Sequence, residues 1–260
     1  MNKKLFVLLA LGAASTRAQT MLDQQQRLIQ IHSLLVGLEP GTAPAAYRPG
    51  ELSLGLELIV IPPIDGQTGG KTQITASDRT PVFPRPRFAI GLPAPDDYRG
   101  YLGATYLPPF QINDVSSHQI GLEVGYARAP ETERLSIGLR GHALLAESKS
   151  PVTDPATRDT LASFVTGLDV SAAWRLDGEQ GSLTPFLGAG FAYVSGHFRV
   201  TSDNDLLTSN TWNPAVYAGL RLHSRLGIEA LAELVIYPGV LIHPVFIIAW
   251  TPDWFSKHKS

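Results

Sequence analysis

The chain of 260 residues contains no cysteine. This absence excludes a disulfide framework, a thiolate metal site and a cysteine nucleophile. Charged residues make up only 17% of the chain, and 21 Lys and Arg nearly balance 23 Asp and Glu, for a net charge of −2. A near-neutral chain of this kind does not bind nucleic acid by charge alone. After the N-terminal region no apolar run reaches the roughly 18 residues of a membrane-spanning helix, so we expect none.

Residues 1–18 predict a secretory signal peptide. Lys3 and Lys4 form a basic start, residues 5–14 are uncharged and mostly apolar, and Ala18 ends a run that suits cleavage. The alternative, a membrane anchor, is disfavoured because this apolar run is too short to span roughly 30 Å of hydrocarbon as a helix. We therefore expect an exported protein.

Residues 19–50 are expected to form a periplasmic helix and a linker. Apolar side chains recur at heptad-like spacing over 21–38, Pro40 follows, and 39–50 are rich in Pro, Gly and Ala. Either this helix packs its apolar stripe on the rest of the protein, or it offers the stripe to a partner protein. The partner-facing residues would be Leu28, Ile31, Leu35 and Leu38.

From Glu51 onward, apolar residues alternate with small or polar ones. The pattern predicts ten strands, at 51–61, 85–93, 100–111, 117–128, 133–147, 160–177, 183–200, 212–223, 225–237 and 240–250. Several are longer than the roughly five or six residues of an average soluble strand and suit the roughly 9–11 residues of a tilted membrane strand. We therefore expect an all-β fold, a closed antiparallel transmembrane β-barrel over 51–250.

The two faces of these strands differ in a way that favours a barrel interior over open solvent. One face is apolar and carries no charge, whereas the other combines Gly, Ser and Ala with scattered charges, as the crowded inside of a narrow barrel does. Buried charges must be paired, so we expect an arginine–carboxylate ladder in the lumen. The alternative is a charged constriction that selects small solutes. The inward residues are Glu57, Glu123, Arg140, His142, Asp169, Arg175, Arg221, Glu229 and Glu233.

The connections between predicted strands alternate in length. Those at 62–84, 148–159 and 201–211 are long, whereas those after the even-numbered strands are short. Bacterial membrane barrels have long extracellular loops and short periplasmic turns. Both chain ends should then lie in the periplasm, with 251–260 as a C-terminal tail.

Together the signal peptide, the alternating strands, the phrase Pro185–Gly190 and the closing strand that ends in Trp250 resemble a bacterial outer-membrane β-barrel protein. The resemblance implies a fold and a location in the outer membrane of a Gram-negative cell, not an activity. The chain departs from the family pattern in the residues 251–260 that follow the terminal aromatic residue. It departs also in Pro244, which predicts a later start or a bulge in the closing strand.

Motifs for chemistry are weak. Gly69–Thr72 lacks the first glycine of a phosphate loop, and Asp203–Asp205 lacks the remaining ligands of a calcium loop. His197 beside Ser195, near the outer end of a strand, is the best catalytic pair, but no third group orients it. We expect no catalytic residues, no metal and no cofactor.

The sequence therefore favours a non-enzymatic outer-membrane barrel that anchors or organises a cell-envelope assembly, for example in surface motility or polysaccharide export. Its partners would be outer-membrane lipid and other envelope proteins, and not nucleic acid. Two alternatives stay open: a narrow, porin-like channel for small solutes, and a hydrolase at the outer rim.

Overall fold

The computed structural model describes residues 21–39, 41–44, 47–60, 82–112, 115–130, 132–150, 156–201 and 205–252. The expected signal peptide and most of the expected tail lie outside these residues. The elements are α1 (Met21–Leu35), β1 (Leu52–Val60), β2 (Val82–Leu92), β3 (Tyr98–Ile112), β4 (Val115–Arg128), β5 (Leu135–Ser150), β6 (Asp159–Trp174), β7 (Leu176–Gly178), β8 (Gly181–Arg199), β9 (Leu206–Ser224), β10 (Ile228–Tyr237) and β11 (Leu241–Trp250). In the part of the chain so described, no helix is long and apolar enough to cross a membrane.

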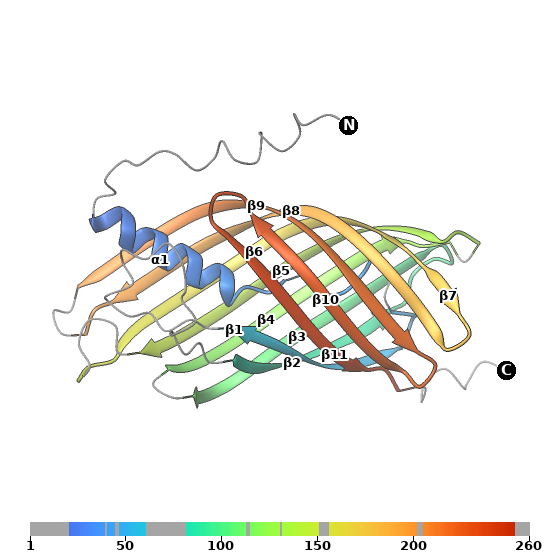
Figure 1. Cartoon of the computed structure of the whole chain (residues 1–260), viewed down its shortest axis with the longest axis horizontal. Coiled ribbons are helices and arrows are strands. Elements are labelled where there is room, and N and C mark those ends of the chain that lie inside the picture. Colours follow the sequence, from blue (N-terminus) through green and yellow to red (C-terminus); the bar gives the residue numbers. More distant parts are fainter. Residues whose placement is uncertain are drawn as a thin grey trace, which may run out of the picture.

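The strands form one closed antiparallel barrel (Figure 1). Neighbours in sequence pair from β1 to β6 and from β8 to β11, β6 pairs with β8, and β1 pairs with β11 from Leu54↔Trp250 to Leu58↔Phe246. The short β7 pairs only with β8 and continues β6 beyond a break at Arg175. The wall therefore has ten strands, which confirms the predicted all-β transmembrane barrel.

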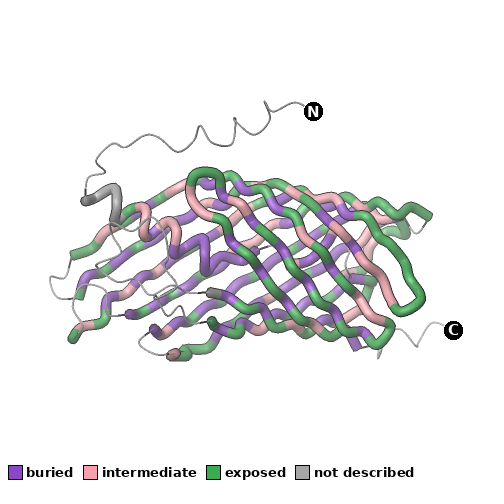
Figure 2. Tube along the Cα trace, in the orientation of Figure 1, coloured by how far each residue is buried: buried purple, intermediate pink, exposed green. Residues whose placement is uncertain are grey.

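Each strand turns one face outward and one inward, because side chains alternate along an extended backbone. On β4, Ile120, Leu122 and Val124 are exposed, whereas Gln119 and Glu123 are buried. The same alternation of exposed and buried residues can be followed along β10 and β11 (Figure 2). An apolar outer surface around a polar interior is the arrangement that a membrane-spanning barrel requires.

Several strand boundaries differ from the prediction, and three of them show how strand pairing, not apolar pattern, sets a boundary. β9 begins at Leu206 rather than at residue 212, since its polar start pairs with the long β8 as far as Arg199↔Leu206. β2 begins at Val82, ahead of two prolines that do not prevent its pairing with β1. β11 begins at Leu241, and Pro244 lies opposite Leu234 with its ring outward, beyond the part of β11 that pairs with β1.

The two ends of the barrel differ. Residues 61–81, 113–114, 151–158, 200–205 and 238–240 connect strands at one end, which we call the loop end. Residues 93–97, 129–134, 179–180 and 225–227 do so at the other, the turn end. The expected long connections thus lie at one end, although the one between β8 and β9 is shorter than predicted.

The N-terminal helix lies within the loop end of the barrel, against β6, β8 and β9 (Figure 1). Ser33 Oγ is 2.7 Å from Ser163 Oγ on β6, and the Gln30 amide donates to Asn213 on β9. Gly196 on β8 gives the helix room, because a Cβ there would overlap Ile29. The sequence predicted a short periplasmic helix ahead of the barrel; in the structure this helix lies inside the barrel, at the end opposite the short turns.

From α1 the chain crosses the lumen to the turn end, where β1 begins. We call its described residues 36–39, 41–44 and 47–50 the lumen segment. Val36 and Leu38 are buried among side chains of the wall, and so are Ala43 and Tyr47 further along. The first part of the chain is thus enclosed by the barrel that the rest of the chain forms.

Candidate functional site

Ion pairs follow the inner wall from β1 to β6. Arg85 binds Glu57 with an Nη2–Oε1 distance of 2.8 Å, and Arg87 binds Glu123 at 2.7 Å. Arg140 joins Glu123 at 2.9 Å to Asp169 at 2.7 Å. His142 Nδ1 lies 3.4 Å from Asp169. These groups are desolvated, so each charge depends on its partner and on the hydrogen bonds around it.

A second ionic cluster lies nearer the turn end, between β9 and β10. Arg221 and Glu229 are 2.6 Å apart, and the Glu229 carboxylate also accepts hydrogen bonds from Thr251 Oγ1 at 2.8 Å and lies 3.1 Å from His223 Nδ1. Because several polar groups surround the Glu229 carboxylate, the Arg221–Glu229 pair has hydrogen-bonding partners although it is buried.

Of the predicted lumen residues, the structure places all but one inside the barrel. Arg175 is the exception: its side chain is 50% exposed and pairs with Asp177, 3.2 Å away, on the surface. The prediction for Arg175 was wrong because the break between β6 and β7 at this residue ends the regular alternation of the strand. Glu233 faces inward and is buried. Its carboxylate accepts a hydrogen bond from the lumen segment, and within the described residues no ion pair joins it to an arginine.

Sequence reasoning missed Arg85 and Arg87. Both are buried and each binds a predicted carboxylate. The strand 85–93 was predicted, and the alternation of Arg85, Arg87 and Ala89 on one face was the available signal, but it was not used to assign the two arginines to the inner face. Glu39 was missed because no periodicity marks the lumen segment.

Three arginines of the ladder also hold the lumen segment by its backbone. Arg85 donates to the carbonyl oxygens of Val36 and Gly37, both at 2.8 Å. Arg140 donates to those of Leu38 at 3.1 Å and Glu39 at 2.9 Å, and Arg87 donates to that of Glu39 at 3.2 Å. The same guanidinium groups therefore neutralise the wall and satisfy carbonyl groups that no secondary structure would pair.

On the opposite wall, β10 and β11 hold the same segment. Tyr237 donates its hydroxyl to the Glu39 carboxylate at 3.0 Å, and His243 Nδ1 lies 3.5 Å from it. The backbone N–H of Gly41 donates to Glu233 at 3.0 Å. Gly41 has a φ of 55°, and a Cβ there would overlap Arg87 and Ile247, so this position requires glycine.

The predicted partner-facing residues pack within the barrel. Leu35 and Leu38 are buried, and Leu28 packs against the apolar cluster around Ile29 and Phe198. Ile31 is half-buried. Of the two alternatives for the helix, packing on the protein itself is the one that the structure shows.

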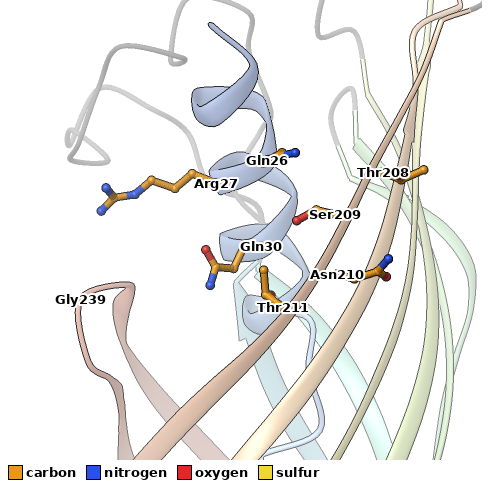
Figure 3. A pocket seen from close by; sticks show the side chains of 8 residues that line it. All are labelled: Gln26, Arg27, Gln30, Thr208, Ser209, Asn210, Thr211 and Gly239. Atoms are coloured by element: carbon orange, nitrogen blue, oxygen red, sulfur yellow. The ribbon is translucent and has the colours of Figure 1, made fainter. Parts of the chain in front are cut away.

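Little space is left beside the lumen segment. Two cavities against it have volumes of about 20 Å³ each, enough for about one water molecule. A larger recess of about 450 Å³ lies at the loop end between α1 and β9 (Figure 3). It is lined by Gln26, Arg27, Gln30, Thr208, Ser209, Asn210, Thr211 and Gly239. The described residues thus form a polar mouth above a filled lumen.

The residues considered for catalysis do not form a site. Ser195 and His197 lie on the outward face of β8, where Tyr193 packs against Trp212 with ring centroids 4.9 Å apart. Residues 69–72 and most of the run Asp203–Asp205 lie outside the described residues.

Comparisons with known proteins give fold likeness alone. No family model matches the chain, and no curated protein matches it in sequence. Among solved structures, a deletion mutant of the monoaromatic hydrocarbon channel TodX is 12% identical, with 81% of this chain and 70% of that chain covered and a TM-score of 0.36. The beta domain of the Bordetella autotransporter BrkA is 11% identical, with 80% and 100% covered and a TM-score of 0.34.

The fold itself follows from the strand pairing. Ten antiparallel strands close on themselves, an apolar surface faces outward, and paired charges fill the interior. The predicted resemblance to outer-membrane β-barrel proteins is therefore confirmed at the level of architecture.

Proposed function

We propose that this protein is a closed, non-enzymatic barrel of the bacterial outer membrane that anchors or organises an envelope assembly. The observation that carries the proposal is the lumen segment, which is held on one side by Arg85, Arg87 and Arg140 and on the other by Tyr237 and Glu233. A barrel filled in this way passes no solute along its axis. The surfaces left for function are the loop end and the outer wall.

Conductance in planar bilayers tests the closed lumen. The wild-type protein should give no steady current. A Ser33→Cys, Ser163→Cys variant, whose disulfide ties α1 to β6, should be equally silent when oxidised and when reduced. The two hydroxyl oxygens are 2.7 Å apart, so the pair is well placed for a bond, and the chain has no other cysteine.

The anchoring role needs a second measurement, because the absence of a current does not by itself show that the barrel binds other envelope proteins. Cross-linking of intact cells followed by purification of the barrel should recover specific envelope proteins. A wild-type barrel that recovers only outer-membrane lipid would contradict the anchoring role while leaving the closed lumen intact.

A narrow channel is the second candidate, and one observation favours it. The lumen segment is not part of the wall, and many of its contacts are hydrogen bonds that water could replace. The polar mouth would then lead to a removable plug. In that case the reduced Ser33→Cys, Ser163→Cys barrel should conduct and the oxidised one should not, which would overturn the closed-barrel proposal.

A further inference from the structure

The wall has an irregular seam between β2 and β3. Their pairing runs from Leu92↔Gly100 to Arg87↔Thr105 and is not continued toward the loop end in the residues that the structure describes. There β2 stays paired with β1 as far as Val60↔Val82, and β3 stays paired with β4 as far as Ile112↔Val115. The two strands thus continue along the wall without a ladder between them.

Prolines on β2 explain why no backbone hydrogen-bond ladder joins β2 to β3 in this region. The carbonyl oxygen of Pro86 accepts a hydrogen bond from Thr105 Oγ1 on β3 at 2.7 Å, so the peptide edge of Pro86 faces β3. In an antiparallel strand alternate residues face the same neighbour, so Pro84 faces β3 as well. Neither residue has an N–H to donate, and β2 therefore cannot continue the ladder.

β3 is irregular at the same level of the wall. Its pairing with β4 shifts register between Leu107 and Phe110, and the two residues between them are Pro108 and Pro109. Four prolines therefore border one seam from both sides. Such an edge also resists the addition of a further strand by a partner protein, because proline cannot donate to it.

Apolar side chains lie on both sides of this seam. Outside it, Val82, Tyr106 and Phe110 are exposed. Inside it lies a buried apolar cluster, which we call the inner apolar cluster: Val36, Leu38, Ile59, Phe83, Leu107, Val115, Leu144 and Ala146. Phe83 from this cluster meets Phe110 edge to face, with ring centroids 6.4 Å apart. Two aromatic rings thus bridge strands that no backbone ladder joins.

We propose that the β2–β3 seam is a lateral binding site for an acyl chain of a membrane lipid. The chain inserts between Phe83 and Phe110 and reaches the inner apolar cluster from the side of the bilayer. Separation of the two rings exposes apolar surface that a hydrocarbon chain covers again. Beyond Arg87↔Thr105 no backbone ladder between β2 and β3 has to break in the described residues. The inference goes beyond the proposed function, since it needs neither an open lumen nor a protein partner.

The test uses a phospholipid with a photoactivatable group near the end of one acyl chain, in vesicles that contain the whole protein. Such a lipid labels outward residues of any membrane barrel, so the informative signal is on inward residues. Peptides that carry Leu107, Val115 and Leu144 should be labelled. The inward Ala192 and Val194, in a wall region with a regular ladder, should stay at background.

Locking the seam should abolish that inner label. A Val82→Cys, Pro109→Cys variant joined by a flexible bis-maleimide ties β2 to β3 at the loop end. The matched control, Phe88→Cys with Ala104→Cys, is joined across the regular part of the same two strands. We expect inner labelling to fall to background in the first and to persist in the second.

A second variant restores the missing donors. Pro84→Val with Pro86→Val lets β2 extend its ladder, and it should reduce inner labelling and raise the unfolding temperature. The control Pro214→Val changes an outward proline within the paired part of β9 and should leave inner labelling unchanged. Inner labelling that is absent in the wild type, or that persists in the locked seam, would overturn the proposal.

Discussion

At the scale of single residues, one charged side chain in the lumen can bind several partners at once. Arg140 binds Glu123 and Asp169 and also two carbonyl groups of the lumen segment. A guanidinium group suits this position because its donors point in fixed directions and it stays charged when buried. A lysine would supply the charge without the geometry. The consequence is that single arginines hold both the wall and the segment inside it.

Arg140→Ala should be strongly destabilising. It leaves Asp169 and Glu123 with fewer partners in a desolvated place, and breaking a buried pair in this way typically costs about 3–5 kcal/mol. The measurement is the temperature at which the barrel unfolds on a heat-modifiability gel. Arg175→Ala is the control, because Arg175 forms an exposed pair whose loss should cost no more than about 1 kcal/mol. Equal shifts for both variants would contradict the placement of Arg140.

Gly41→Val should loosen the lumen segment while it leaves the strands unchanged. The new side chain would overlap Arg87 and Ile247, and valine disfavours a φ of 55°. We expect faster proteolysis within residues 36–50, with circular dichroism of the barrel retained. Gly50→Val is the comparison, since Gly50 has a similar φ of 77° but nothing within 4 Å of its Cβ position. If both variants are cleaved alike, backbone strain and not the lumen contact is the cause.

At the scale of elements, the helix and the barrel wall depend on each other. α1 has 15 residues, and helices of this length are marginal in water without tertiary contacts. The wall supplies those contacts through Ser163, Gly196 and Asn213. His32 is part of this packing: it is buried, and its Nδ1 has no hydrogen-bond partner among the described residues.

Docking of α1 should therefore weaken in mild acid. Burial lowers the pKa of His32 from 6.5 to about 4, so the docked helix disfavours the proton that the undocked helix accepts. As the pH falls through the window from 6.5 to about 4, the undocked state binds more protons and gains stability relative to the docked state.

The measurement is the labelling rate of Ser33→Cys by a methanethiosulfonate, relative to an exposed cysteine at position 97. The ratio should rise below pH 6.5 in this variant. The same variant with His32→Gln should lose that rise, because glutamine does not titrate. A rise that survives His32→Gln would assign the pH dependence to another group.

At the scale of the whole molecule, the barrel has two unlike ends. The loop end carries the long connections, the polar mouth and α1, whereas the turn end carries short turns, the start of β1 and the end of β11. In membrane barrels of bacteria the long loops are extracellular. If this barrel has the same orientation, we expect α1 at the outer surface of the cell and not in the periplasm.

Single cysteines test this orientation. Arg27→Cys, in the polar mouth, and Gly239→Cys, in the β10–β11 connection, should react with an impermeant maleimide on intact cells. Asp97→Cys and Gln180→Cys, at the turn end, should react only after the outer membrane is opened. Arg27→Cys that behaves like the turn-end positions would reverse the orientation.

Local pattern alone determined the class of fold. Alternation of the kind seen in Gln119–Tyr126 needs nothing beyond the pleat of a strand, and ten such segments with one apolar face specify a membrane barrel. The same alternation placed Glu123, Arg140 and Asp169 inside. It failed at Arg175, where a strand breaks. It was not applied to Arg85 and Arg87, although both lie in the predicted strand 85–93 and their side chains face the lumen.

What fills the barrel was decided by the tertiary structure. The apolar stripe of residues 21–38 is compatible with a partner or with the protein's own wall, and periodicity is the same in both cases. The wall decides between them because it brings together groups far apart in the chain, such as Arg87, Arg140 and Tyr237 around Glu39. Backbone carbonyl groups of the lumen segment bind these arginines, and carbonyl groups leave no mark in a sequence. The packing of the lumen segment therefore depends on contacts that exist only once the barrel has formed.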